Sequence, residues 1–310
     1  AASLSLVRCE VVRNGGVGVL VHRPGAEAVL EECVVTEHSE MGVAVQDGAQ
    51  AKLDRVELLR NRHAGVYGDG PRSWLSIWRC TVDGSGVRGV GVQGGASIEV
   101  AECKIVNNAQ EGIFVSGRGS RLMLRGGEVR RNGRGVVGQT KAFLMISGAE
   151  ITNNTEGGVL VSDAETLVSL TGSNISHNLR GIGVQLGATA EVQGNRIEGN
   201  GAEGVYVSRA GSRALLVRNQ IMGNGVKGVG VQHGAAAVME SNEVAGNALV
   251  GVHVDGQGSS AILRFNTMVA HPRAVVAEDG GMLRTVANRI EDGEPVPASP
   301  ARGGTLSLGA

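Results

Sequence analysis

Residues 195–207 read Asn-Arg-Ile-Glu-Gly-Asn-Gly-Ala-Glu-Gly-Val-Tyr-Val, and residues 219–231 read Asn-Gln-Ile-Met-Gly-Asn-Gly-Val-Lys-Gly-Val-Gly-Val. The second half of this unit, Gly-apolar-x-apolar, recurs along the chain every 23 or 24 residues. It begins at Gly18, Gly42, Gly65, Gly89, Gly112, Gly135, Gly158, Gly181, Gly204, Gly228 and Gly251, and Ala274 takes the last place. A fixed period of this length indicates a solenoid of stacked coils.

The first half of each unit carries two polar columns beside an uninterrupted apolar one. One of these columns holds small or polar residues, namely Cys9, Cys33, Val56, Cys80, Cys103, Gly127, Ala149, Ser173, Asn195, Asn219, Asn242, Asn266 and Asn288. The other is mostly Asn with His38 and His271. Coils of a β-solenoid lie about 4.8 Å apart, so like residues stack on like residues. We therefore expect buried Asn amides to hydrogen-bond from coil to coil, and the four thiols to pack as small apolar groups.

The half-motif L-x-L-x-x-(C/N)-x-(V/I) also fits a leucine-rich repeat, which would place a helical turn in the second half of each coil. Here the second half is the alternating, β-branched Gly-Val-x-Val-Gln, which favours a strand. We therefore predict three short strands per coil, three parallel sheets along residues 3–290, and almost no helix.

On the repeated units at residues 195–207 and 219–231, the chain resembles the right-handed parallel β-helix repeat family of the pectin-lyase-like superfamily. The resemblance covers roughly residues 3–290 and implies an all-β, right-handed parallel β-helix of about 12 coils. Its members include lyases, hydrolases, epimerases and non-enzymatic binding modules, so it does not decide the function.

The expected organisation is a β-helix over residues 1–290, followed by a Pro-containing linker and the start of a C-terminal cap or further coil over residues 291–310. The chain opens inside a repeat, so we expect it to be part of a longer protein. Its formal charge of −1 argues against nucleic-acid binding, and no apolar run is long enough to span a membrane.

The outward positions of the Gly-apolar-x-apolar strand show a period of two coils. Large residues (Tyr67, Phe114, Leu160, Tyr206 and His253) alternate with Gly or small residues. Their spacing, about 9.6 Å or twice the distance between strands, suits a row of sugar-stacking side chains. The expected ligand-binding residues are Tyr67, Asp69, Phe114, Tyr206, His253, Asp255 and Glu278. The alternative interpretation is that the large residues cover neighbouring glycines.

The resemblance passes no catalytic residue to this chain. Lyases of the fold use carboxylates that hold calcium beside a basic residue, its pectin hydrolases use clustered Asp, and its alginate epimerases carry an Asp-Pro-His-Asp run that is absent here. We expect a non-catalytic, extracellular or cell-surface module that binds polysaccharide or presents a rigid surface, without a cofactor or metal. The alternatives are a lyase or epimerase acting on an acidic glycan at His253, Asp255 and Glu278, where Ca²⁺ would be a candidate ligand, and a protein-interaction scaffold.

Overall fold

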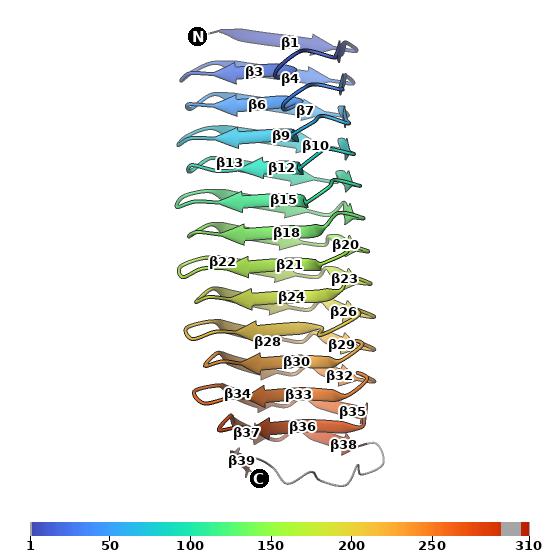
Figure 1. Ribbon diagram of the computed structural model, residues 1–310, viewed down its shortest axis with the longest axis vertical. Helices are drawn as coiled ribbons and strands as arrows, with labels where there is room; N and C mark the ends of the chain where they lie inside the picture. Colours follow the sequence, from blue (N-terminus) through green and yellow to red (C-terminus); the bar gives the residue numbers. More distant parts are fainter. Residues whose placement is uncertain (1, 293–304, 310) are drawn as a thin grey trace. The chain divides into compact units, whose positions relative to one another are not determined.

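The computed structural model describes residues 2–292 and 305–309, and in these residues every regular element is a β-strand. The chain divides into two compact units, Ala1–Thr155 and Glu156–Ala310, which are described separately. In each unit the chain runs through a first, a second and a third strand and then begins the next coil (Figure 1). The strands at these three positions make the first, second and third sheets.

In the first unit, the first sheet consists of β1 (Ser3–Val7), β4 (Glu27–Glu31), β7 (Gln50–Asp54), β10 (Trp74–Trp78), β13 (Ser97–Ala101), β16 (Arg121–Arg125) and β19 (Phe143–Ser147). The second sheet consists of β2 (Glu10–Val12), β5 (Val34–Thr36), β8 (Glu57–Leu59), β11 (Thr81–Asp83), β14 (Lys104–Val106), β17 (Glu128–Arg130) and β20 (Glu150–Thr152). The third sheet consists of β3 (Val19–His22), β6 (Val43–Gln46), β9 (Ala64–Asp69), β12 (Arg88–Val92), β15 (Glu111–Ser116) and β18 (Arg134–Gln139).

In the second unit, the first sheet consists of β22 (Leu167–Thr171), β25 (Thr189–Gln193), β28 (Arg213–Val217), β31 (Ala236–Glu240), β34 (Ser260–Arg264), β37 (Met282–Val286) and β39 (Thr305–Gly309). The second sheet consists of β23 (Asn174–Ser176), β26 (Arg196–Glu198), β29 (Gln220–Met222), β32 (Glu243–Ala245), β35 (Thr267–His271) and β38 (Arg289–Asp292). The third sheet consists of β21 (Gly157–Ser162), β24 (Arg180–Gln185), β27 (Val205–Ser208), β30 (Lys227–Gln232), β33 (Val250–Asp255) and β36 (Arg273–Glu278).

Neighbouring strands within each sheet are parallel. Their pairing is in register, as for Leu75 with Ile98 and Ile197 with Ile221, apart from a shift between β35 and β38 near Val269 and His271. Their inward side chains are almost all Val, Ile, Leu or Ala with little or no exposed surface, and they form the core. The predicted all-β solenoid with three parallel sheets is therefore confirmed. Because the described residues contain no helix in any coil, the leucine-rich alternative is wrong.

The turn between the first and second sheets explains one polar column. A residue in the left-handed region, such as Arg218 at φ 52°, reverses the chain and is followed by a buried side chain, here Asn219. The amide of Asn219 donates to Val192 O at 2.8 Å and to Asn242 Oδ1 at 3.0 Å. Its own Oδ1 accepts from the backbone and side-chain nitrogens of Asn195, at 2.9 and 3.1 Å. One side chain thus satisfies polar groups of the preceding and the following coil.

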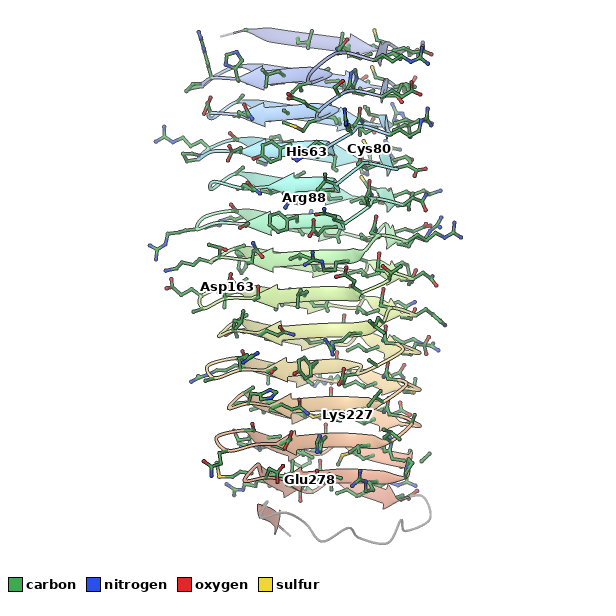
Figure 2. The ribbon with its side chains drawn as sticks, in the orientation of Figure 1. His63, Cys80, Arg88, Asp163, Lys227 and Glu278 are labelled. Atoms are coloured by element: carbon green, nitrogen blue, oxygen red, sulfur yellow. The ribbon has the colours of Figure 1, made fainter. Side chains whose placement is uncertain are left out.

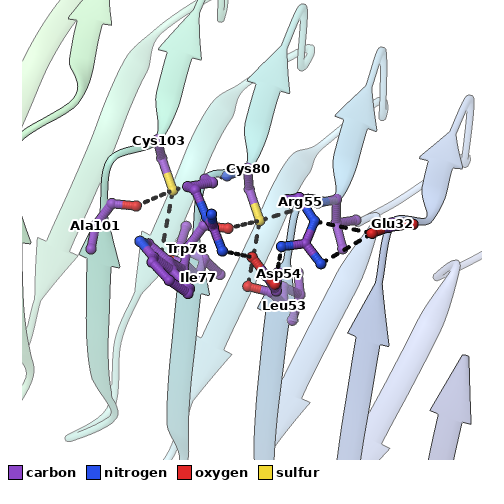
Figure 3. A network of polar contacts seen from close by, with 11 residues as sticks. Glu32, Leu53, Asp54, Arg55, Ile77, Trp78, Cys80, Ala101 and Cys103 are labelled. Carbon is purple, nitrogen blue, oxygen red and sulfur yellow. Dashed lines mark hydrogen bonds and ion pairs between the residues drawn. The ribbon is translucent and has the colours of Figure 1, made fainter. Parts of the chain in front are cut away.

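In the first unit, cysteine takes the same position with simpler bonding. All four cysteines are free thiols. Cys103 Sγ accepts from the backbone N–H of Cys80 at 3.4 Å, and Cys80 Sγ does so from Val56 (Figure 3). Just outside them, Arg55 bridges the carboxylates of Glu32 and Asp54, both drawn in the same close-up. These exposed ion pairs contribute little to stability, and the thiols serve as small core residues.

The two-coil period is visible in the turn between the third and first sheets. Alternate coils carry a longer turn with a buried hydroxyl, at Ser73 and Ser120 in the first unit and at Ser212 and Ser259 in the second. Ser212 Oγ donates to Ser208 O at 2.7 Å and accepts from Gly187 N of the preceding coil at 3.0 Å. The intervening coils have Ala at this position, for example Ala188 and Ala235, in a turn one residue shorter.

Most of the expected linker, residues 293–304, lies outside the described residues. After it, β39 pairs in parallel with β37, with Leu306 opposite Leu283.

Candidate functional site

The candidate site is the outer face of the third sheet, which carries the outward positions of the Gly-apolar-x-apolar strand. Figure 2 labels Arg88 on the third-sheet strands of the first unit, and Lys227 and Glu278 on those of the second. In-register pairing places like positions in columns, so that Tyr206 is followed by Gly230, His253 and Val276. A parallel column runs from Ser208 through Gln232 and Asp255 to Glu278.

Ionisable side chains gather around His253 on β30, β33 and β36 of the second unit. His253 Nε2 lies 3.5 Å from Glu278 Oε2, and Arg273 Nη1 lies 3.5 Å from Glu278 Oε1. Asp255 is the register partner of Glu278, as the sequence predicted. The imidazole is 8% exposed, and its Nδ1 is buried without a hydrogen-bond partner.

Burial lowers the pKa of both basic side chains of this group, His253 and Lys227. Burial lowers the pKa of His253, and the positive charge of Lys227 lowers it further, while Glu278 and Asp255 oppose the shift. Burial also lowers the pKa of Lys227, against the opposing effect of Glu203. No carboxylate of the described residues lies within ion-pair distance of the Lys227 ammonium, so two adjacent basic groups have unused hydrogen-bonding capacity.

Tyr206 lies two coils before His253 and is partly buried by its neighbours. The Arg180 guanidinium lies 4.4 Å from the centre of the ring, and Arg180 Nε bonds Glu203 at 2.9 Å. On the side of the following coil, the ring edge approaches Gly230: a Cβ built there would lie 3.7 Å from Tyr206 Cδ2. Tyr206 therefore forms a wall of the site, with one face already occupied by a cation.

The first unit has a related but closed arrangement. Arg88 lies over the Phe114 ring at 3.8 Å from its centre. The buried carboxylate of Glu111 receives Arg88 at 3.0 Å and Arg134 at 2.9 Å. Both arginines are held by Glu111 and the ring is covered, so this part of the face offers no free donor comparable to Lys227.

Tyr67 and Asp69 belong to the next strand toward the N-terminus, β9. The Tyr67 hydroxyl donates to Gln93 Oε1 at 3.3 Å, and the ring lies over Gly91, where an added Cβ would be 3.1 Å from Tyr67 Cδ2. Burial and then the charge of Asp69 raise the pKa of Tyr67.

The expectation of an exposed row of stacking side chains is wrong for two of its members. Phe114 is 6% and His253 is 8% exposed, because basic and carboxylate side chains of adjacent columns cover them. Tyr67, Leu160 and Tyr206 lean over the glycine of the following coil, which is the packing role weighed as the alternative. The seven expected residues therefore fall into two groups. Those of the first unit are Tyr67, Asp69 and Phe114, and those of the second are Tyr206, His253, Asp255 and Glu278.

The assumption that side chains alternate strictly between inward and outward along the third strand did not predict the residues that cover the rings. Arg88, Glu111, Arg134, Arg180, Glu203, Lys227 and Arg273 each stand immediately before the first residue of the Gly-apolar-x-apolar motif. Alternation would turn this position inward, but the motif glycine also faces inward, since a Cβ at Gly228 would strike Gly251 O and Asn247 Nδ2. Two successive inward residues break the alternation and turn the preceding side chain outward. The run of charges at this one position was the available signal.

Among residues 2–292 and 305–309, no three His, Cys, Asp or Glu side chains are arranged to hold a metal ion. Within the same residues, no helix with the length and apolar character of a membrane span is found.

Solved structures of low sequence identity share the fold. The A-module of the Azotobacter vinelandii mannuronan C-5 epimerase AlgE4 aligns with a TM-score of 0.66 and 13% identity, covering 100% of this chain and 91% of that one. The periplasmic alginate epimerase AlgG aligns at 0.57 and 13%, covering 85% and 76%. The A. vinelandii AlgE6 A-module aligns at 0.50 and 13%, covering 94% and 91%.

No curated protein matches the chain in sequence. The family model described as a right-handed β-helix region matches residues 2–129 and 128–268. These two matches extend over most of the repeated coils. The chain therefore belongs to the right-handed β-helix family.

Proposed function

We propose that this protein is a non-catalytic β-helix module that binds an anionic polysaccharide across the outer face of the third sheet in its second unit. The observation that carries the proposal is the pair formed by Lys227 and His253. Within the part of the chain that the structure describes, the half-buried ammonium has no ion pair, and the adjacent imidazole has a buried Nδ1 without a partner. Buried polar groups without hydrogen-bond partners destabilise a protein unless a ligand supplies those partners.

Each group suits a different part of a charged sugar. Lys227 would bind a carboxylate. With Nε2–H directed at Glu278, His253 Nδ1 is a hydrogen-bond acceptor and would receive a sugar hydroxyl. Gly230 lies between Tyr206 and His253 in the same column and adds no side chain of its own to the site.

The comparisons support this substrate class at low identity. Two of the similar structures are named as a mannuronan epimerase module and a periplasmic alginate epimerase. The proposal includes a location outside the cytoplasm, supported by the periplasmic name of one of them.

The test is direct binding of alginate, with uncharged dextran as the matched neutral polymer. We expect alginate to bind, more weakly at higher salt, and Lys227→Met to weaken it about tenfold, as for a lost charge-assisted hydrogen bond. Lys104→Met, at an exposed lysine of the second sheet, is the control and should bind as wild type does. Tyr206→Ala should also weaken binding. Equal binding by wild type and Lys227→Met, or no binding of any anionic glycan, would overturn the proposal.

The same pair of side chains favours a second candidate, a lyase or epimerase. A neutral His253 could remove the proton next to a sugar carboxylate while Lys227 stabilises the charge that develops. Incubation with alginate, with and without Ca²⁺, distinguishes the two: new unsaturated ends or inverted sugar units in the NMR spectrum would show catalysis. In that case His253→Ala, Asp255→Ala and Glu278→Ala should each abolish turnover.

A further inference from the structure

The outer face of the first sheet in the first unit carries several large apolar side chains. Both tryptophans of the chain, Trp74 and Trp78, lie on β10, and Trp78 is 44% exposed. Met145 on β19 is 43% exposed, and Met123 on β16 is half-buried. Aromatic, Met and Arg side chains together on a surface are typical of protein interfaces.

In-register pairing arranges the outward side chains of β4, β7, β10, β13 and β16 in three columns. In this strand order they are Glu27, Gln50, Trp74, Ser97 and Arg121; Val29, Lys52, Ser76, Glu99 and Met123; and Glu31, Asp54, Trp78, Ala101 and Arg125. The carboxylates and guanidinium groups at the two ends of the first and third columns are exposed.

Apart from Asp54, whose counterpart is Ala101, the charges of these columns are antisymmetric about β10. Two strands before it, β4 carries Glu27 and Glu31, and two strands after it, β16 carries Arg121 and Arg125. In the middle column, the neighbours of β10 are of opposite charge: Lys52 on β7 and Glu99 on β13. A surface with this pattern is complementary to itself after reversal of the strand order.

We propose that this face pairs with the same face of a second copy, about a two-fold axis that runs parallel to β10. Such an axis reverses the strand order and keeps each column opposite itself. Glu27 then faces the second copy's Arg121, Glu31 faces its Arg125, and Lys52 faces its Glu99. Along the axis, each tryptophan of β10 meets its own equivalent.

The remaining positions fit the same arrangement. Val29 faces Met123, an apolar pair, and Gln50 faces Ser97, a polar pair. Asp54 faces Ala101, and its carboxylate is already bound by Arg55 and Arg79 of its own chain. Arg125 is bound to Glu99 within one chain at 3.0 Å and would be shared with the Glu31 opposite. Within the three columns, no position brings like charges together; Arg79, whose guanidinium lies 3.6 Å from the centre of the Trp78 ring, is outside them.

The two kinds of contact have different roles. Burial of Trp74, Trp78 and Met123 supplies the affinity, since tryptophan dominates most interfaces. The charge pairs are exposed, so they contribute little affinity but select the reversed orientation over others. Five short strands make a small interface, so we expect a reversible dimer with a Kd in the micromolar range. This pairing uses a different sheet and unit from the polysaccharide site and does not depend on it.

Sedimentation equilibrium of the full chain over a concentration series tests the proposal. Wild type should show a monomer–dimer equilibrium. The double variant Glu27→Arg/Glu31→Arg should raise the Kd by tenfold or more, about the effect of like charges placed face to face, and so should Arg121→Glu/Arg125→Glu. The variant with all four changes should dimerise as wild type does, because both altered pairs are restored with their signs inverted.

A matched pair of reversals, Glu10→Arg/Glu57→Arg on the exposed face of the second sheet, should leave the equilibrium unchanged. Far-ultraviolet circular dichroism of each variant shows whether it is folded. A wild type that stays monomeric throughout the series would overturn the proposal. So would a quadruple variant that is folded but no better at dimerising than either double variant.

Discussion

Buried asparagine side chains make the hydrogen bonds to turn groups that water makes at an exposed turn. In the second unit, Asn219 makes four hydrogen bonds with groups of the coils before and after it, and Asn224 bonds Asn247 and Ile197 O in the same manner. Both side chains are almost fully buried. A shorter side chain at either position would leave several buried donors and acceptors without partners.

We predict that Asn219→Ala lowers the free energy of unfolding by about 1–3 kcal/mol, the cost of buried polar groups left unpaired. Asn242→Ala should do the same. Gln193→Ala, at an exposed outward position of the same unit, should change it by less than about 0.5 kcal/mol. Urea unfolding followed by circular dichroism measures all three, and unchanged midpoints for the two Asn variants would show that water replaces the lost bonds.

His38 occupies an asparagine position and makes it sensitive to pH. Its Nδ1 accepts from Asn14 N at 3.0 Å, and its Nε2 lies 3.0 Å from Val11 O, so the buried ring is neutral. Burial lowers the pKa of His38 below its usual value. The unfolded chain therefore takes up the proton first, at about pH 6.5, and stability present above this pH is lost as the pH falls toward the folded pKa.

Replacing His38 by Asn should reduce this loss, because Asn61 makes the equivalent bonds in the next coil without titrating. We expect the melting temperature of His38→Asn to fall less than that of wild type between pH 7 and pH 5. His63→Asn, at an exposed histidine, is the control and should follow wild type. If the melting temperatures of wild type and His38→Asn fell equally between pH 7 and pH 5, His38 would not be the source of the pH dependence.

The third strand of each coil is defined by its glycine. A Cβ at Gly228 would lie 2.6 Å from Gly251 O and 2.8 Å from Asn247 Nδ2, so the strand can approach the next coil only without a side chain there. Two residues later, a Cβ at Gly230 would meet nothing closer than 3.6 Å. The two glycines of this strand therefore have different roles. Gly228 allows close packing on the inner side, and Gly230 leaves space on the outer face.

This difference gives a matched pair of substitutions on β30. Gly228→Ala should destabilise the protein by about 1–3 kcal/mol or more, since the methyl group overpacks the inner side of the turn. Gly230→Ala should be neutral or slightly stabilising, because alanine lowers the conformational entropy of the unfolded chain. Equal urea midpoints for the two variants would show that the strand accommodates the added methyl group equally well at both positions.

The fold and the proposed function depend on different parts of the surface. The stacked coils need only inward apolar residues, glycine and Asn, and the similarity to solved structures at 13% identity concerns this framework. The outer faces are free to vary. In this protein they carry a basic and partly buried polar cluster on the third sheet of the second unit, and an aromatic, charge-patterned face on the first sheet of the first unit.

Much of this could be predicted from the sequence because a solenoid repeats its local environment. The spacing of Gly228 and Gly251, and of Asn219 and Asn242, already places these residues on top of one another. The period therefore gave the coils, the parallel sheets and the inward columns. It also placed Asp255 beside Glu278 and identified the alternation of large and small residues that includes Tyr206.

Only the tertiary structure decided what covers these residues. Lys227 turns outward because the alternation breaks at Gly228, and the buried state of His253 results from side chains of three strands together. The reversed charge order about Trp74 likewise needs the register of five strands. A repeat determines which residues are stacked, because stacking follows from chain length per coil. The repeat does not determine which outward side chains are exposed or paired. These properties depend on side chains from neighbouring coils and adjacent columns, which the alternation along one strand does not reveal.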